Sequence, residues 1–502
     1  MSLIKQFVFV EFCKLMHLPI LQNSVLYSSM IMNKSIKRGN EIKMLLDNFK
    51  RKNTFENILL LFILVQPILD LATSLAINYL NSEFTAGILI RFAMMAIGAI
   101  YLLFVSNSKK KKTAIIYLLL LGLFISLGFI NNIMVKSPMS LAEEIKFIIK
   151  SVYFVVLFFS YLYVFKQLQS RTSWENTTLK YIVYAMTLVG LSMLIAGLTN
   201  TAFSSYTYNK VGNTGWFYAG NEISAIMSIC FPIVVLYAIK KTTSLKSFYY
   251  WIPALLLIYS LMAVGTKVGF GAALVTLLIS LVMLIVELFM MRANRKYNVK
   301  ANLLINAIIF ILFIFYIPFS PIAANTSIHL SLLQEEAKTG NQAVEHGKPE
   351  KPGKTQGNKE NLDNQQLENF VLSSRGEYLS QQKEYFTDAP ISQKMLGMGY
   401  AGNYKEYPKL TEMDFYDLFF SFGIVGFILY FIPFFLLAIL IIKKIFTNFK
   451  SNFTLENILI ASGIVLGVGI AFTAGHVFTA PAVSIYLAIL IASLYMKIVN
   501  PS

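Results

Sequence analysis

Long apolar runs separated by short polar connections make up most of the chain. A helix that crosses a bilayer needs about 20 predominantly apolar residues. The runs of about this length lie near 57–80, 84–105, 113–133, 145–166, 179–199, 219–239, 249–266, 268–290, 301–323, 413–442, 456–475 and 478–497. The pattern predicts an all-α fold, a polytopic membrane helical bundle of about twelve transmembrane helices.

Lys and Arg are concentrated in every second connection between these runs. They precede the first run and form the KKKK stretch at 109–112, and they recur near 166–180, 240–246, 292–300 and 443–450. The intervening connections contain almost none. Because cytoplasmic loops of membrane proteins carry an excess of Lys and Arg, we expect both termini to be cytoplasmic and the other connections to be extracytoplasmic.

Composition narrows the class of protein further. Of the 502 residues, 56% are hydrophobic and 14% are charged, which excludes a water-soluble domain of this size. The net charge of +17 lies mostly at the predicted cytoplasmic face, where it meets anionic lipid rather than nucleic acid. Cys13 and Cys230 are too far apart in sequence to suggest a disulfide framework or a zinc site. We therefore expect a multi-pass protein of the cell membrane.

The chain divides into four parts. Residues 1–53 are predicted to be a cytoplasmic or interfacial N-terminal tail, and the alternative is a start at Met44, which would leave residues 1–43 outside the native protein. The other parts are helices 1–9, one large extracytoplasmic loop, and helices 10–12, at 54–323, 324–412 and 413–502.

The large loop has two different compositions. Residues 334–366 have almost no large apolar side chains, so they cannot bury enough surface to offset the entropy of ordering, and we expect a flexible linker. Residues 367–390 space their apolar side chains as an amphipathic helix does, with Arg375 inside the helix and Pro390 at its end. The glycine-rich LGMGYAGN of 396–403 then leads towards the next apolar run.

Three carboxylates stand at the mouth of that run. The sequence LTEMDFYDLFFSFGIVGFILY contains Glu412, Asp414 and Asp417, and an Asp at the centre of a transmembrane helix costs about 2.5–3.5 kcal/mol. We hypothesise that these acids face a polar cavity under the loop. Asp414 and Asp417 share a helix face, but no known ligand pattern accompanies them, and we predict neither a metal nor another cofactor.

The remaining extracytoplasmic connections contribute single candidates. Lys267 in VGTKVGF suggests a bound anion, with extension of the side chain to the lipid interface as the alternative. Asn221 and Glu222 in GWFYAGNEIS are candidates that helix capping and the helix dipole would also explain. His476 in AGHVFTAP is either a proton acceptor or a hydrogen-bonded structural residue.

Together these residues suit transfer chemistry on a lipid diphosphate. Arg375 and Lys267 would hold the diphosphate through charge-assisted hydrogen bonds. The candidates for accepting the proton of a hydroxyl group are Glu412, Asp414, Glu222 and His476. Inside the apolar runs, the further candidates are Asp70 and Arg91, for which structural pairing is the alternative.

Several motifs resemble those of a known family. A GNE begins one predicted helix, a short outer hairpin carries a basic residue, and the large loop contains SSRGEY, PISQKMLGMGY and then EMDFYDLFFSFGIVGFILY. This order resembles the O-antigen ligase and O-antigen polymerase superfamily, in which a serine–arginine pair, a glycine-rich turn and a closing helix follow one another. The resemblance extends from about residue 215 to residue 480.

The resemblance implies a metal-independent, inverting glycosyltransferase. Such enzymes move a glycan from undecaprenyl diphosphate to an acceptor hydroxyl at the outer face, in the synthesis of bacterial surface polysaccharides such as capsules. Arg375 matches the family's loop arginine and Lys267 the position where arginine is commoner, so both would bind the donor diphosphate. The ligases carry a histidine late in the loop, where this chain has Glu412 and Asp414, so the base stays open.

The resemblance also implies the partners. These are an undecaprenyl-diphosphate-linked oligosaccharide donor, a glycan or cell-wall acceptor and membrane lipid, with a flippase and chain-length regulators as further candidates. With Glu412 and Asp414 in place of the histidine, the chain is closer to the family's variants of envelope-polysaccharide synthesis from bacteria that lack an outer membrane.

Two other functions fit a twelve-helix protein. One is a lipid-linked glycan flippase or another transporter, and such proteins usually have two related halves with a site near the midplane. The other is a structural or scaffolding subunit. The sequence has no convincing internal repeat and gathers its polar residues at the predicted outer face, which favours the enzyme.

Overall fold

The computed structural model describes residues 53–81, 85–108, 111–169, 174–206, 211–290, 297–328, 331 and 375–501. The predicted N-terminal tail, apart from Asn53, and the predicted linker 334–366 lie outside these residues. The chain separates into two units at Phe55, and the unit Glu56–Ser502 contains nearly all of the described residues.

Twelve helices among the described residues are long and apolar enough to cross a membrane, which confirms the prediction. No β-strand occurs in the same part of the chain. The spans are α3 (Thr54–Leu80), α4 (Ala86–Ile100) continued by η1 (Tyr101–Val105), α5 (Lys111–Val135), α6 (Leu141–Leu168), α7 (Trp174–Leu198), α8 (Gly220–Lys241), η2 (Leu245–Trp251) continued by α9 (Ile252–Val264), α10 (Lys267–Phe289), α11 (Val299–Tyr316) continued by η3 (Ile317–Phe319), α16 (Asp414–Thr447), α18 (Leu455–Thr473) and α19 (Pro481–Ile498).

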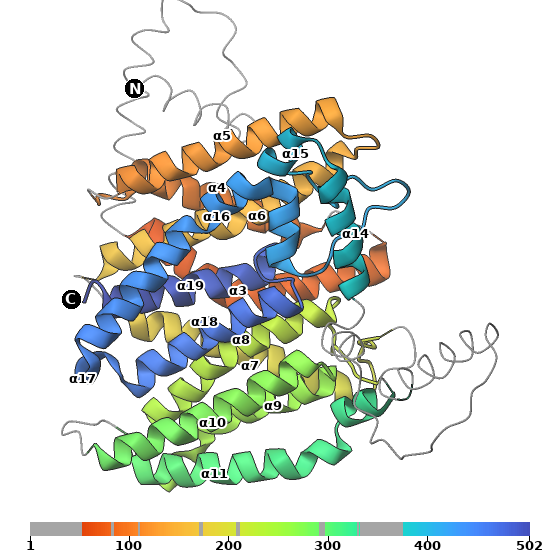
Figure 1. Ribbon diagram of the computed structural model, residues 1–502. Coiled ribbons are helices and arrows are strands. Elements are labelled where there is room, and N and C mark those ends of the chain that lie inside the picture. Colours follow the sequence, from red (N-terminus) through yellow and green to blue (C-terminus); the bar gives the residue numbers. More distant parts are fainter. Residues whose placement is uncertain are drawn as a thin grey trace, which may run out of the picture. The chain divides into compact units, whose positions relative to one another are not determined.

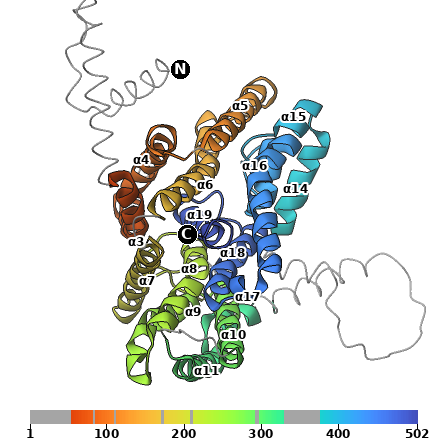
Figure 2. The same cartoon turned by 90° about the vertical axis from the view of Figure 1, so that its left-hand side faces the viewer.

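The most buried helices are α6, α8 and α19, and Figure 2 shows α19 in the middle of the bundle between the other two. Close packing depends on small residues where helices meet. On α18, a Cβ atom at Gly463 would lie 2.7 Å from the Ile229 carbonyl oxygen of α8, and one at Gly467 would lie 3.1 Å from the Ile229 side chain. The GxxxG spacing of α18 therefore lets its backbone approach α8 closely.

The peripheral helices expose apolar side chains, as lipid contact requires. Leu119 and Leu123 on α5 and Phe315 on α11 are more than half exposed. A water-soluble protein rarely exposes contiguous apolar surface on this scale. The exposed faces of α5 and α11 therefore suit a hydrocarbon environment.

The helix α16 is broken inside the predicted span. Gly423 has φ 68° and ψ −177°, and Figure 1 shows the helix bending along its length. The break frees two carbonyl groups, and those of Phe420 and Ser421 accept hydrogen bonds from the backbone N–H groups of Met398 (2.9 Å) and Gly399 (3.1 Å). Backbone groups at membrane depth need such partners. The predicted run 413–442 is thus two helical segments, joined where the glycine-rich turn docks.

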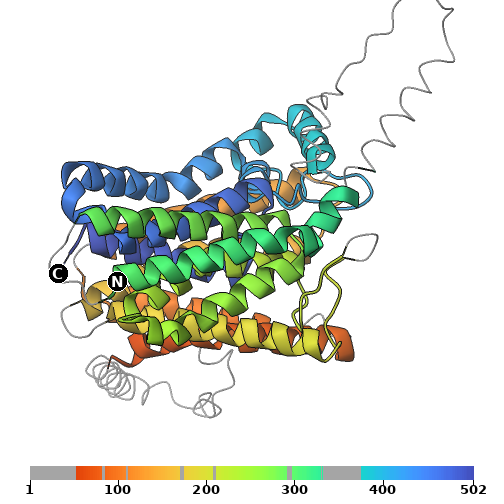
Figure 3. The ribbon, with the colours of Figure 1, turned by 90° about the horizontal axis from the view of Figure 1, so that it is seen from below.

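Two short helices, α14 (Arg375–Asp388) and α15 (Ile391–Leu396), lie at the same end of the bundle as the connection between α7 and α8 (Figures 1 and 3). We call this the loop end. The opposite end, which we call the basic end, carries α17 (Phe449–Asn452) and the end of α19. The helix predicted in 367–390 is confirmed over α14. Arg375 is its first described residue, and Pro390 is the N-cap of α15.

Candidate functional site

At the loop end, α14 brings Arg375 to a carboxylate–lysine pair. The Arg375 guanidinium lies 3.6 Å from Glu412 Oε2, and Lys409 Nζ lies 2.7 Å from Glu412 Oε1. The Arg375 side chain is only 14% exposed, and within the described part of the chain its Nε has no hydrogen-bond partner. Among the described residues, two cations thus surround one carboxylate, which leaves an excess positive charge and a buried N–H group without a partner.

The environment of Glu412 keeps it ionised. Burial raises the pKa of this carboxyl, but the hydrogen bond and charge of Lys409, with the charge of Arg375, outweigh burial and lower the pKa below its ordinary value. The same hydrogen bond raises the pKa of Lys409. A general base works best when its pKa lies near the operating pH. Glu412 is therefore better suited to holding cations than to accepting a proton.

Asp414 fastens the connection between α18 and α19 to the start of α16. Its carboxylate accepts hydrogen bonds from the backbone N–H groups of Val477 and Phe478 and from Thr479 Oγ1, each at 2.7 Å. The backbone N–H of His476 donates a fourth, at 3.2 Å. Charge-assisted bonds of this kind offset the cost of burying the carboxylate. They also hold His476 in a left-handed conformation, with φ 58°.

Asp417 closes the turn before the same helix. It accepts hydrogen bonds from the backbone N–H (2.7 Å) and hydroxyl (2.8 Å) of Thr411. Asp414 and Asp417 are 1% and 4% exposed. The hypothesis that these two acids face a polar cavity is therefore wrong, because protein hydrogen-bond donors enclose both carboxylates. Glu412 differs, since it keeps a partly exposed side chain among cations.

Two further connections at the loop end approach Arg375. Burial raises the pKa of Tyr206, and the charge of Arg375 acts in the opposite direction, so the two side chains are close enough to interact electrostatically. The Tyr206 hydroxyl donates to the Gly265 carbonyl oxygen (3.3 Å), beside the start of α10. Lys267 is the first residue of α10, so the predicted basic hairpin lies on the same end of the bundle as Arg375.

The start of α10 is tied to α8. Thr266 is the N-cap of α10 and accepts a hydrogen bond from the Gly269 N–H (3.1 Å). Its hydroxyl also lies 2.6 Å from the Ser224 hydroxyl of α8. Asn221 and Glu222 lie in the first turn of α8, but the N-cap is Ala219. The alternative that Asn221 caps this helix is therefore wrong.

Asp70 and Arg91 form a pair inside the bundle. Arg91 donates to Asp70 Oδ1 at 2.5 Å and to Gln66 Oε1 at 3.1 Å, joining α3 to α4. Glu222 is close enough to Arg91 to interact with it electrostatically. No contact among the described residues joins Asp70 or Arg91 to Arg375, and their arrangement is the structural pairing given above as the alternative.

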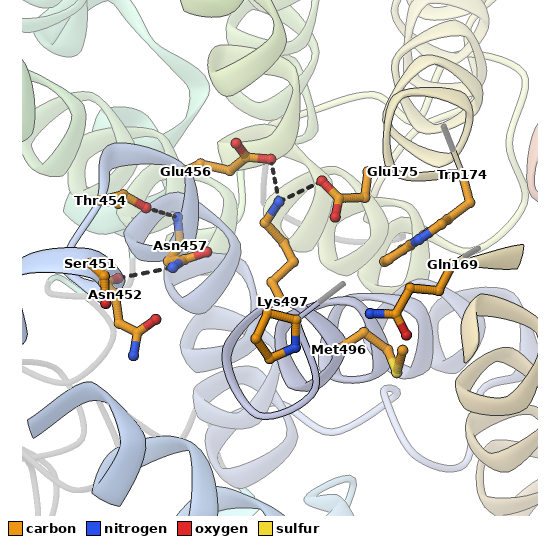
Figure 4. Close-up of a pocket in the computed structure, with 11 residues that line it drawn as sticks. Gln169, Trp174, Glu175, Ser451, Asn452, Thr454, Glu456, Asn457, Met496 and Lys497 are labelled. Atoms are coloured by element: carbon orange, nitrogen blue, oxygen red, sulfur yellow. Dashed lines mark hydrogen bonds and ion pairs between the residues drawn. The ribbon is translucent and has the colours of Figure 1, made fainter. Parts of the chain in front are cut away.

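A cavity of about 240 Å³ lies at the basic end (Figure 4). Lys497 bridges Glu175 (2.7 Å) and Glu456 (2.9 Å), and Lys240 lies 3.0 Å from Glu456. Two carboxylates and two ammonium groups neutralise one another there and fasten α7, α8, α18 and α19. Sequence reasoning missed this cluster, although charged residues at or near the ends of four predicted spans were its signal.

Sequence reasoning also missed Lys409 and Tyr206. Lys409 stands three residues before Glu412 in an exposed stretch of the loop, and this spacing was the available signal. Tyr206 had none, because its role depends on contacts with distant residues. Among the described residues, no three His, Cys, Asp or Glu side chains come close enough together to hold a metal ion.

The twelve candidate spans define a multi-pass helical membrane protein, and its loop end carries the Arg375, Lys409 and Glu412 group. The family model of O-antigen ligase like membrane proteins matches residues 52–500, and the chain belongs to this family. A comparison with curated proteins finds no match. Membership places the protein in the ligase and polymerase class of surface-glycan biosynthesis, and it implies a lipid-linked glycan donor and a glycan acceptor.

Proposed function

We propose that the protein is a glycosyltransferase that transfers or polymerises an undecaprenyl-diphosphate-linked glycan onto an acceptor hydroxyl, at the outer face of the membrane. The observation that carries the proposal is Arg375, a largely buried guanidinium with an unpartnered Nε among the described residues, beside the Lys409–Glu412 pair. In a member of this family, such a donor suits a diphosphate.

The proposed diphosphate site combines two outer segments. Arg375 supplies the planar fork that matches phosphate oxygens, and Lys267 supplies a point charge from the start of α10. Glu412 holds Arg375 in place before the donor binds. Both cations would stabilise the negative charge that develops on the leaving diphosphate, which is the usual means of lowering such a barrier.

We assign proton acceptance to His476. Asp414 is enclosed by four donors, and the pKa of Glu412 is held low by its cations. Glu222 lies towards Arg91 instead. Histidine is the side chain that most readily exchanges protons near neutral pH, and Asp414 fixes the backbone of His476 next to Glu412.

In the proposed reaction, the acceptor hydroxyl attacks the anomeric carbon from the side opposite to the diphosphate. The new carbon–oxygen bond forms as the bond to the diphosphate oxygen breaks, and His476 takes the hydroxyl proton. Undecaprenyl diphosphate leaves with the bonding electrons, and the configuration at the sugar inverts. No step is assigned to a metal ion, because side-chain cations supply the charge stabilisation.

The proposal places the loop end outside the cell. Lys240 and Lys497 lie at the opposite end of the bundle, with the other basic connections, and excess Lys and Arg mark the cytoplasmic side. Lipid-linked glycans for surface polymers would then meet Arg375 and His476 after they reach the outer leaflet.

The test uses the purified full chain with an undecaprenyl-diphosphate oligosaccharide in EDTA, following released undecaprenyl diphosphate and glycan products. Arg375→Ala should lower turnover by about 100-fold, as loss of a charged transition-state contact does. Lys383→Ala, on the exposed face of α14, should retain activity. A ladder of products would indicate a polymerase, and a single attachment a ligase. Equal turnover by Arg375→Ala and Lys383→Ala would contradict the proposal.

A further inference from the structure

The turn between α15 and α16 is held on two sides by side chains that the proposed chemistry does not use. We call residues 397–411 the bridge segment. It begins at the break of α16, where Met398 and Gly399 bond to freed carbonyl groups, and it ends next to Glu412. One of its last residues, Lys409, carries the ammonium group that pairs with Glu412.

On one side, Gln382 ties the bridge segment to α14. Its Nε2 donates to the Ala401 carbonyl (2.9 Å) and to the Lys409 carbonyl (3.0 Å), and the residue is 3% exposed. Gln382 lies seven residues after Arg375, which places both on one face of the helix. A Cβ atom at Gly402 would lie 2.4 Å from Gln382 Oε1, so the turn leaves room only for glycine.

On the other side, side chains from the hairpin of α5 and α6 form hydrogen bonds with the backbone of Tyr400. Lys136 Nζ donates to Glu144 Oε1 and to the Tyr400 carbonyl, both at 2.6 Å. The Tyr400 N–H donates to Glu144 Oε2 at 2.8 Å. Both charged side chains are almost completely buried. Asn132 adds a hydrogen bond to the Gly397 carbonyl (3.1 Å), so the transmembrane hairpin fixes the bridge segment at several points.

We propose that Gln382 and the Lys136–Glu144 pair are positioning residues for the diphosphate site. By holding the bridge segment, these three residues fix the positions of Lys409 and Glu412. Gln382 also fixes α14, and therefore Arg375, relative to those two residues. Neither Gln382 nor the pair contacts Arg375 or His476 in any described interaction. The catalytic part of this inference rests on the proposed function, whereas the mechanical part does not.

The mechanical part is tested by hydrogen–deuterium exchange on the full chain in lipid nanodiscs. Gln382→Met removes both donors at similar volume, and its matched control is Gln381→Met, one residue earlier on the exposed face of α14. Loss of two buried hydrogen bonds should speed amide exchange across the bridge segment about tenfold, with no change in the control. Unchanged exchange in Gln382→Met would overturn the inference, whatever the protein catalyses.

The catalytic part is tested by the kinetics of the same two variants. A misplaced Arg375 should raise the KM for the lipid-linked donor about tenfold in Gln382→Met. A merely structural loss would reduce the amount of folded enzyme and the maximal rate but leave KM unchanged, and that result would overturn the positioning role. If the wild-type chain turns over no donor, the proposed function fails, and exchange alone decides the mechanical part.

The orientation of the buried Lys136–Glu144 pair relative to the backbone of Tyr400 gives a further test. Tyr400 presents its carbonyl to Lys136 and its N–H to Glu144, so exchanging the charges leaves each backbone group facing the wrong partner. Lys136→Met, which removes the donor to the Tyr400 carbonyl, should speed amide exchange across the bridge segment. The double variant Lys136→Glu/Glu144→Lys should show the same fast exchange. If the double variant restored slow exchange and the donor KM, the pair would be a simple ion pair and its positioning role would be wrong.

Discussion

Asp414 illustrates how a carboxylate is kept at the start of an apolar helix. Its four donors come from residues more than sixty positions later in the chain. A buried carboxylate without such donors would be neutralised or would destabilise the fold. The sequence revealed the acid and its unfavourable position but not its partners. The AGHVFTAP connection contains no motif that predicts binding of a carboxylate.

We predict that Asp414→Asn destabilises the protein by about 2–3 kcal/mol, because an amide retains one acceptor and turns its NH₂ group towards backbone donors. The measurement is the thermal unfolding midpoint in detergent, obtained by size-exclusion chromatography of samples heated to different temperatures. Asp388→Asn, at the exposed end of α14, is the matched control. Identical midpoints for the two variants would show that the four hydrogen bonds of Asp414 do not stabilise the protein.

Glu412 gives a prediction on pH. Its pKa is lowered in the folded protein, so its contribution to stability is present above the unfolded pKa of about 4.3 and is lost as the pH falls through the lower folded value. Glu412→Gln should therefore unfold at a lower temperature than wild type at neutral pH.

The difference in unfolding temperature between Glu412→Gln and wild type should disappear in acid, below about pH 4. Glu384→Gln, exposed on α14, serves as the control and should follow the wild type throughout. A difference between Glu412→Gln and wild type that persisted unchanged into acid would show that the cation cluster does not stabilise the folded state.

At the level of elements, the break in α16 shows what apolar patterning does and does not predict. The run is apolar on both sides of Gly423, so its length and position were predicted, whereas the break was not. The break depends on contact with the glycine-rich turn, since a Cβ atom at Gly397 would lie 2.0 Å from the Ser421 carbonyl oxygen. Such contacts are invisible to a pattern read along one segment.

We predict that Gly423→Ala costs at least about 3 kcal/mol of stability. Its φ of 68° disfavours any side chain, and the new methyl group would lie 2.5 Å from the Gly397 nitrogen. Gly122→Ala on α5, where a Cβ atom meets nothing within 4 Å, should leave the unfolding temperature unchanged or slightly raised. Equal unfolding temperatures for Gly423→Ala and Gly122→Ala would contradict this account.

At the scale of the whole molecule, the predicted spans agree with the structure because hydrocarbon thickness sets the length of every crossing helix. Hydropathy therefore predicts how many helices there are and roughly where each one lies. The candidate site was less accessible, because Arg375 and Glu412 lie thirty-seven residues apart and meet only through the fold. Resemblance to a family indicated Arg375, whereas the Lys409 pairing and the Gln382 contacts required coordinates.

The orientation of the molecule rests on the distribution of Lys and Arg, and it gives the last prediction. In a chain with Cys13→Ser, the remaining Cys230 is fully buried and should not react. Lys405→Cys, exposed in the bridge segment at the loop end, should react with a membrane-impermeant maleimide in intact cells. Lys246→Cys, exposed between α8 and α9 at the basic end, should react only after the membrane is opened, because excess Lys marks the cytoplasmic side. The reverse labelling would place Arg375 and His476 inside the cell, where a donor delivered to the outer leaflet could not reach them.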